Sequence, residues 1–82
     1  MIEVLYFAWV RERIGIPRER VETDAATVAD LVAELMARED RYAYAFEDQA
    51  ALRVALDQEL STFDAPIAGV REIAFFPPMT GG

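Results

Sequence analysis

The chain has 82 residues, a formal net charge of −7 and an apolar fraction of 54%, with no cysteine. This composition indicates one small globular domain and excludes disulfides, thiolate nucleophiles and cysteine-based metal sites. The acidic charge disfavours nucleic acid and anionic membranes as partners and makes a basic protein partner the natural complement. With neither a long apolar run nor a signal peptide in the sequence, we expect a cytoplasmic protein that does not enter a membrane.

The chain is expected to open with a β-hairpin. Residues 2–10 alternate between two stripes rich in aromatic and β-branched side chains, which predicts a strand. Residues 11–17 include Gly15 and Pro17 and are typical of a short helical turn followed by a loop. Residues 18–23 then return as a second strand.

One main helix is expected next. Thr27 is placed to act as its N-cap, and Asp30 falls in the first turn, where a negative charge is favourable. A helical apolar stripe follows, made of Val28, Leu31, Val32, Leu35 and Met36. Residues 39–51 carry a mixed pattern and are expected to form a loop with one helical turn at most.

Three further strands complete the expected fold. They cover the alternating residues 52–56, the short segment 60–63 and residues 71–76, after which Pro77-Pro78 ends the pairing. The order ββαβββ predicts an α+β domain with one helix against a mixed sheet of four or five strands, the β-grasp or ubiquitin-like layout. We expect the domain to span residues 1–76 and a flexible C-terminal tail to span 77–82.

The side chains leave little room for autonomous catalysis. The chain has no His, Cys or Lys, so the usual general base near neutral pH, the covalent thiol and the Schiff-base amine are all missing. Adjacent carboxylates occur in or beside predicted turns, and we interpret them as solvated surface rather than as a metal or glycosidase site. They are Glu22/Asp24, Glu39/Asp40, Glu47/Asp48 and Asp57/Glu59.

The C-terminal residues Gly81 and Gly82 offer a different chemistry. Two residues without Cβ can pass through a narrow channel and expose the terminal carbonyl, and Pro77-Pro78 stiffens the arm that carries them. A carboxylate is a poor electrophile, so Gly82 first needs activation as an acyl adenylate, from which a sulfur donor displaces AMP to give a thiocarboxylate. The alternative is a frayed tail without a role.

One face of the sheet should stay uncovered, because a single helix covers one side only. Glu3 and Glu72 mark the outward stripe. The period of two then places apolar residues on the same side, namely Leu5, Phe7, Trp9, Ala74 and Phe76, with Leu60 as a further candidate. The prediction is a docking surface for protein partners; the alternative is that residues 39–51 cover it.

Two segments at the ends of the chain are distinctive: Met1-Ile2-x-Val4-Leu5-Tyr6-Phe7-Ala8-x-Val10-Arg11-Glu12 and Ile73-Ala74-Phe75-Phe76-Pro77-Pro78-Met79-Thr80-Gly81-Gly82. Together with the turn Ser61-Thr62-Phe63-Asp64-x-Pro66, they resemble the small, sulfur-carrier subunit of molybdopterin synthase. The likeness extends over essentially the whole length of the chain.

The resemblance implies a non-catalytic carrier without a stably bound cofactor. A ubiquitin-E1-like adenylyltransferase would adenylate Gly82 with ATP and Mg²⁺, and a sulfur donor such as a cysteine desulfurase or a rhodanese would supply the sulfur. The tail would then enter the large subunit, in a heterotetramer, and donate sulfur to cyclic pyranopterin monophosphate. Phe7, Leu60 and Phe76 match the family's hydrophobic contact positions, and Arg11 matches a charged position nearby.

The chain departs from the family pattern at two turns. Asp57 stands where the family usually has Asn, and Gly69-Val70-Arg71-Glu72 replaces an acidic Gly-Asp-Glu turn. Three other functions stay open: a sulfur carrier for thiamine synthesis or tRNA thiolation, a ubiquitin-like protein modifier, and a plain interaction domain.

Overall fold

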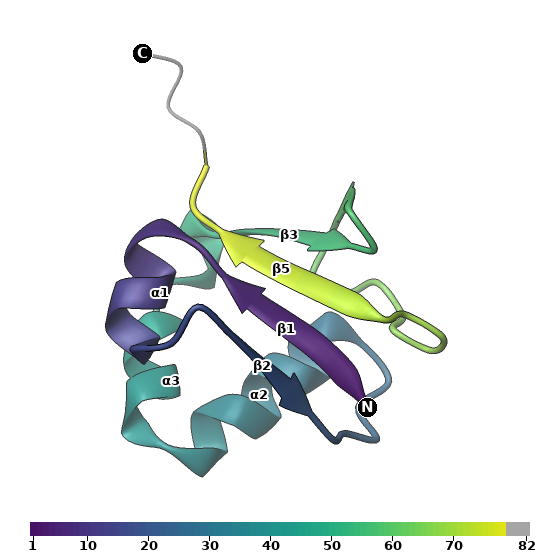
Figure 1. Ribbon diagram of the computed structural model, residues 1–82, viewed down its shortest axis with the longest axis horizontal. Coiled ribbons are helices and arrows are strands. Elements are labelled where there is room, and N and C mark those ends of the chain that lie inside the picture. The colour runs from purple at the N-terminus through teal and green to yellow at the C-terminus, as the bar shows by residue number, and fades with distance from the viewer. Residues whose placement is uncertain (79–82) are drawn as a thin grey trace.

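The computed structural model describes residues 1–78 (Figure 1), so the predicted site residues Gly81 and Gly82 lie outside the described residues. Within 1–78 the sheet has five strands. The strands are β1 (Ile2–Tyr6), β2 (Arg18–Val21), β3 (Arg53–Leu56), β4 (Glu59–Ser61) and β5 (Glu72–Phe76). The helices are α1 (Ala8–Ile14), α2 (Val28–Arg38) and α3 (Asp40–Ala45), with a 3₁₀ turn, η1, at Gln49–Ala51.

The sheet is mixed, with the order β2-β1-β5-β3-β4. Its central pair, β1 and β5, runs parallel, whereas the other neighbours are antiparallel. The predicted ββαβββ order and the α+β, β-grasp fold are therefore confirmed. Because the central pair is parallel, both strands end at the same end of the molecule, and β5 leads from there into Pro77 (Figure 1).

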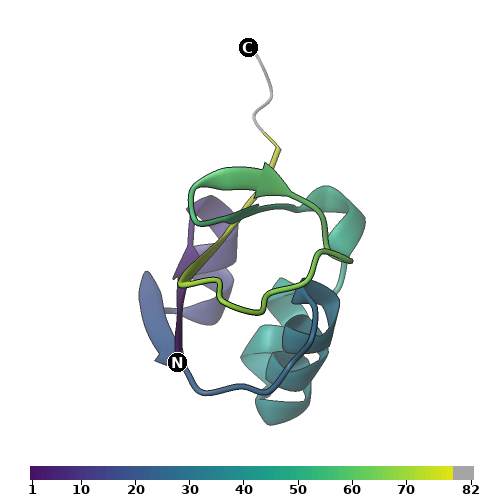
Figure 2. The ribbon, with the colours of Figure 1, turned by 90° about the vertical axis from the view of Figure 1, so that its right-hand side faces the viewer.

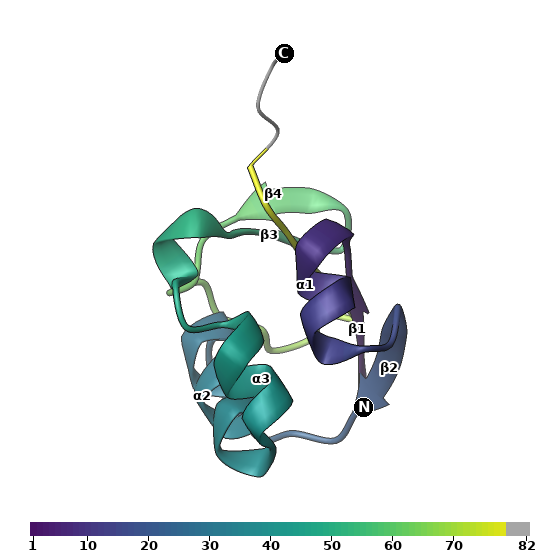
Figure 3. The same ribbon diagram turned by 90° about the vertical axis from the view of Figure 1, so that its left-hand side faces the viewer.

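The helices α2 and α3 pack on one side of the sheet (Figures 2 and 3), and the core lies between the two layers. The predicted cap is present, since the Asp30 N–H donates to Thr27 Oγ1 at 3.2 Å. Strands and helices contribute the buried side chains, among them Val4, Tyr6, Val54, Ile73 and Phe75 from the sheet, and Leu31, Leu35, Tyr42 and Phe46 from the helical side.

The prediction of a strand over residues 2–10 is wrong beyond Tyr6. Phe7 is still extended, but Ala8 has φ 53°, a left-handed conformation that ends the strand and begins α1. Val10 and Ile14 are buried at helical spacing. Trp9 therefore lies on a helix, packed against the core, and does not extend the outward stripe of β1.

Residues 39–51 form more structure than the expected loop. They contain α3 and η1, and Tyr42, Ala45 and Phe46 are fully buried in the core. α3 packs against α1 and α2, on the helical side of the sheet (Figure 3). The alternative that this segment covers the outer face of the sheet is therefore wrong.

A partly buried hydrogen-bond network joins the sheet to α3. Glu19 on β2 points to the core side, where its Oε2 accepts from the Tyr6 hydroxyl at 2.7 Å and from the Tyr42 hydroxyl at 2.5 Å. Burial and the nearby carboxylate raise the pKa of Tyr6 and raise that of Tyr42 to about 12. Both phenols therefore stay protonated donors at neutral pH.

The turn at Asp57 explains one departure from the family pattern. Asp57 and Gln58 join β3 to β4 with φ values of 49° and 72°, as a two-residue hairpin of type I′ requires. The Asp57 carboxylate oxygen Oδ1 accepts the backbone N–H groups of Arg71 and Glu72, each at 3.0 Å. The oxygen of an Asn amide offers the same acceptor, so aspartate preserves the anchor to β5.

Candidate partner-binding face

The side of the sheet opposite α2 and α3 is not covered by a helix, and we call it the open face (Figures 1 and 2). Outward residues in register form three rows across the strands. The first row, at the start of β1 and β5, is Arg20, Glu3 and Glu72; the middle row is Arg18, Leu5, Ala74, Ala55 and Leu60; the last row pairs Phe76 with Arg53.

The apolar residues gather in the middle row and at the end where β5 leaves the sheet. Leu60 is 72% exposed and Phe7, directly after β1, is 45% exposed. Phe76 is half-buried and pairs with Arg53 in the last row. The predicted outward stripe is thus present, with Trp9 removed from it and Ala55 added. Such a patch, bordered by charges, is typical of a protein-binding surface.

The first row is charged, and its charges are partly neutralised within the chain. The Arg18 guanidinium donates two hydrogen bonds to the Glu3 carboxylate, from Nη2 to Oε1 at 2.8 Å and from Nε to Oε2 at 3.2 Å. This hydrogen bond holds the pKa of the Glu3 carboxyl below its usual range. The open face therefore has one polar end and one apolar end, and the apolar end adjoins the exit of the chain toward residue 82.

Arg11 lies on α1, one turn after Phe7, and its side chain is exposed. Its backbone N–H donates to the Phe7 carbonyl at 3.4 Å, so the start of α1 is fixed to the end of β1. The structure thus places Phe7, Leu60 and Phe76 on one face, and Arg11 on the helix that begins directly after Phe7. The predicted reactive group, the Gly82 carboxylate, lies outside the described residues.

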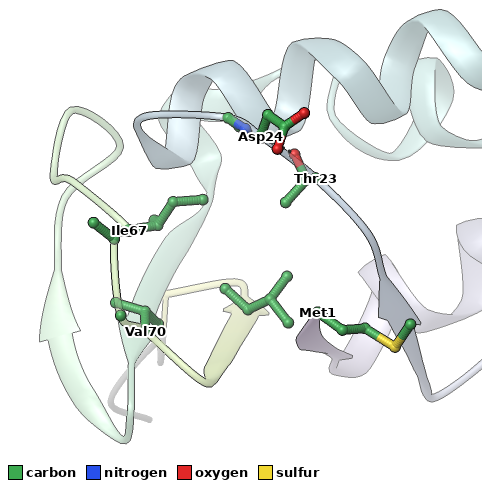
Figure 4. Close-up of a pocket in the computed structure, with 9 residues that line it drawn as sticks. Met1, Thr23, Asp24, Ile67 and Val70 are labelled. Carbon is green, nitrogen blue, oxygen red and sulfur yellow. Dashed lines mark hydrogen bonds between the residues drawn. The ribbon is translucent and has the colours of Figure 1, made fainter.

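Away from the open face, the described surface has a hollow whose polar groups make local contacts. A shallow hollow of about 240 Å³ lies between the β2–α2 connection and the loop before β5, with Thr23, Asp24 and Ile67 on its wall (Figure 4). The Thr23 hydroxyl there accepts from the Ala25 N–H at 3.0 Å, a local turn contact. Residues 1–78 contain no group of three or more His, Cys, Asp or Glu side chains that could hold a metal ion.

Within the same residues, no helix combines the length and the apolarity that crossing a bilayer requires.

Comparison with known proteins identifies the family. A family model described as the ThiS family matches residues 4–82. The chain belongs to the ThiS family. Its relatives include the molybdopterin synthase sulfur carrier subunits of Escherichia coli K12, 46% identical, and of Haemophilus influenzae, 40% identical, each aligned over 82 residues and over 100% of both chains. The resemblance stated from the sequence is confirmed.

The ThiS-family fold is also shared with a solved structure. The crystal structure of SAMP1 from Haloferax volcanii superposes with a TM-score of 0.74 at 27% identity, covering 99% of this chain and 98% of SAMP1. Sequence reasoning missed the contributions of Ala55 and Arg53 to the open face. Both lie in a correctly predicted strand, but only the register with β5 shows which rows they complete.

Proposed function

We propose that this chain is the sulfur carrier of a molybdopterin synthase and that it carries sulfur as a thiocarboxylate on Gly82. An E1-like adenylyltransferase attaches AMP to the Gly82 carboxylate at the expense of ATP, with Mg²⁺, and pyrophosphate leaves. The persulfide of a sulfur donor such as a cysteine desulfurase or a rhodanese then displaces AMP and forms an acyl disulfide. A second thiol attacks the donor's sulfur, so that a disulfide forms on the donor side and the Gly82 thiocarboxylate is released. The loaded tail enters the large subunit, where Gly81, which has no side chain, passes through a narrow channel. The thiocarboxylate then gives its sulfur to cyclic pyranopterin monophosphate.

The observation that carries this proposal is the position of the open face. Its apolar end, with Phe7 and Phe76, adjoins the point where β5 passes into Pro77 and the final residues. A partner that docks on this face therefore receives the C-terminus close to its own surface. The full-length similarity to sulfur carrier subunits supports the same assignment.

A carrier role also fits the chemistry of the side chains. The chain contains no His, Cys or Lys, and the two tyrosines with raised pKa values donate to the half-buried Glu19. The carrier therefore supplies the acyl group, whereas the adenylating enzyme and the large subunit supply catalysis. We propose that carrier and large subunit assemble as a heterotetramer and that the chain works in the cytoplasm.

Intact mass spectrometry tests the tail chemistry. After incubation with the adenylyltransferase, ATP, Mg²⁺ and a sulfur donor, the chain should gain the mass difference between sulfur and oxygen, at one position. Removing Gly82 should abolish both this gain and molybdopterin formation without lowering the unfolding temperature. Retained synthase activity after the deletion would refute the role of Gly82.

The same experiment separates the alternatives. A ubiquitin-like modifier would appear as a covalent adduct of the whole chain on lysines of other proteins. A carrier for thiamine synthesis or tRNA thiolation would acquire the thiocarboxylate but would not convert the pterin substrate in the presence of the large subunit.

A further inference from the structure

The open face differs in charge from the rest of the chain. Although the chain has a net charge of −7, the outward strand residues include three arginines, Arg18, Arg20 and Arg53, and two glutamates, Glu3 and Glu72. Arg18 is paired with Glu3, and Arg20 stands opposite the same carboxylate in register. Both glutamates thus lie in the same row as Arg20, at the end of the sheet remote from Phe76.

Arg53 stands apart from these carboxylates. It begins β3 and pairs with Phe76, the last residue of β5, so Arg53 is next to the strand from which the chain passes into Pro77. Its Nη1 donates to the carbonyl oxygens of Leu52 at 3.0 Å and Ala50 at 3.5 Å, which fixes the side chain over η1. Among residues 1–78, no carboxylate lies within ion-pair distance of Arg53.

Arg53 also borders a groove. A hollow of about 280 Å³ lies between η1 and the β3–β4 hairpin, and Leu52 and Phe63 contribute apolar wall to it. Polar side chains complete the lining, namely Gln49, Arg53, Ser61 and Thr62. The groove thus combines an apolar wall with one cation that has further N–H donors, and it lies at the start of β3, where Arg53 pairs with Phe76.

We propose that this groove docks an acidic segment of the protein partner and that Arg53 determines its specificity by pairing with a carboxylate of that segment. A guanidinium that is already held by two carbonyl groups loses little freedom when it binds, and it presents its remaining N–H groups in a planar fork. A carboxylate is the complementary group for this fork. The inference rests on the proposed function, because it places the segment on the partner that receives the tail.

Three variants with the same net charge provide the test. Arg53→Gln removes the cation, Gln49→Glu adds a negative charge to the groove, and Arg38→Gln removes an exposed cation from the end of α2, on the helical side. Affinity for the large subunit is measured by calorimetry at low and at physiological ionic strength. Arg53→Gln and Gln49→Glu should each weaken binding about tenfold, and Arg53→Gln should also reduce the salt dependence.

Arg38→Gln should bind within about twofold of the wild type, because rim charges remote from the contact change affinity little. Equal losses in Arg38→Gln and Arg53→Gln would assign the effect to overall charge and overturn the proposal. Unchanged affinity in Arg53→Gln would also overturn it. If Arg53→Gln lowers the unfolding temperature, Gln49→Glu is the deciding variant: weakened binding supports the proposal and unchanged affinity overturns it. Phe76→Asp separates the two proposals. If Arg53→Gln and Phe76→Asp both bind the large subunit with wild-type affinity, the proposed function fails as well. If Phe76→Asp weakens binding and Arg53→Gln does not, the proposed groove alone is rejected.

Discussion

Leu60 is the most direct probe of the open face, because its side chain is 72% exposed and contributes little to the core. Burying a whole leucine side chain is worth about 1.5–3 kcal/mol, so a partner that covers the exposed part gains roughly 1–2 kcal/mol. Leu60→Ser should therefore weaken binding to the large subunit by about 5- to 30-fold. Isothermal titration calorimetry measures this loss, and a thermal unfolding scan should show a change in stability within about 0.5 kcal/mol.

The matched control is Tyr44→Ser. Tyr44 is 53% exposed, but it lies on α3, away from the open face, and stacks on Arg13 with 4.3 Å between the guanidinium carbon and the ring centre. Its replacement should leave the affinity unchanged. The reasoning is refuted if Leu60→Ser binds as tightly as the wild type, or if Tyr44→Ser loses as much.

Three further predictions concern stability. Ala8→Gly should raise the free energy of unfolding by about 0.5–1 kcal/mol, since glycine removes the strain at φ 53°; a lower melting temperature would contradict this. Asp57→Asn should be nearly neutral in thermal unfolding, whereas Asp57→Ala should cost about 1–2 kcal/mol, because two backbone N–H groups lose their acceptor. The pKa of Tyr42 is raised to about 12, above the unfolded value of about 10, so its contribution is complete below pH 10 and is lost as the pH rises through 12. Tyr42→Phe should therefore flatten the fall in melting temperature over that window, and tyrosinate absorbance should show one titration fewer near pH 12. An identical profile would exclude Tyr42 as a cause.

The elements that the sequence predicts well are those specified by neighbouring residues. Thr27 caps α2 and four residues of the predicted stripe are buried, because capping and helical periodicity are local properties. The same applies to β5, where outward and buried residues alternate as expected before Pro77. The position of Glu72 and Phe76 on the outward side followed from that alternation alone.

Other features depend on contacts that no local pattern contains. The alternation of β1 continues through Trp9 in the sequence, and only the left-handed Ala8 and the packing of Val10 and Ile14 turn the chain into α1. Tyr42 is separated in sequence by 23 residues from Glu19, the carboxylate that it binds. Such pairs decide that residues 39–51 fold onto the helical side and so leave the open face free.

Net charge is a further case in which the average over the chain misleads. A value of −7 favours a basic partner for the molecule as a whole. The strand register nevertheless places Arg18, Arg20 and Arg53 on the open face, and two of the three stand beside Glu3. Of these three, Arg53 has no carboxylate neighbour among residues 1–78 and lies at the end of the sheet where a partner would meet the tail, so the contact there favours an acidic group. The acidic remainder of the surface then repels that same group elsewhere and directs it toward the groove.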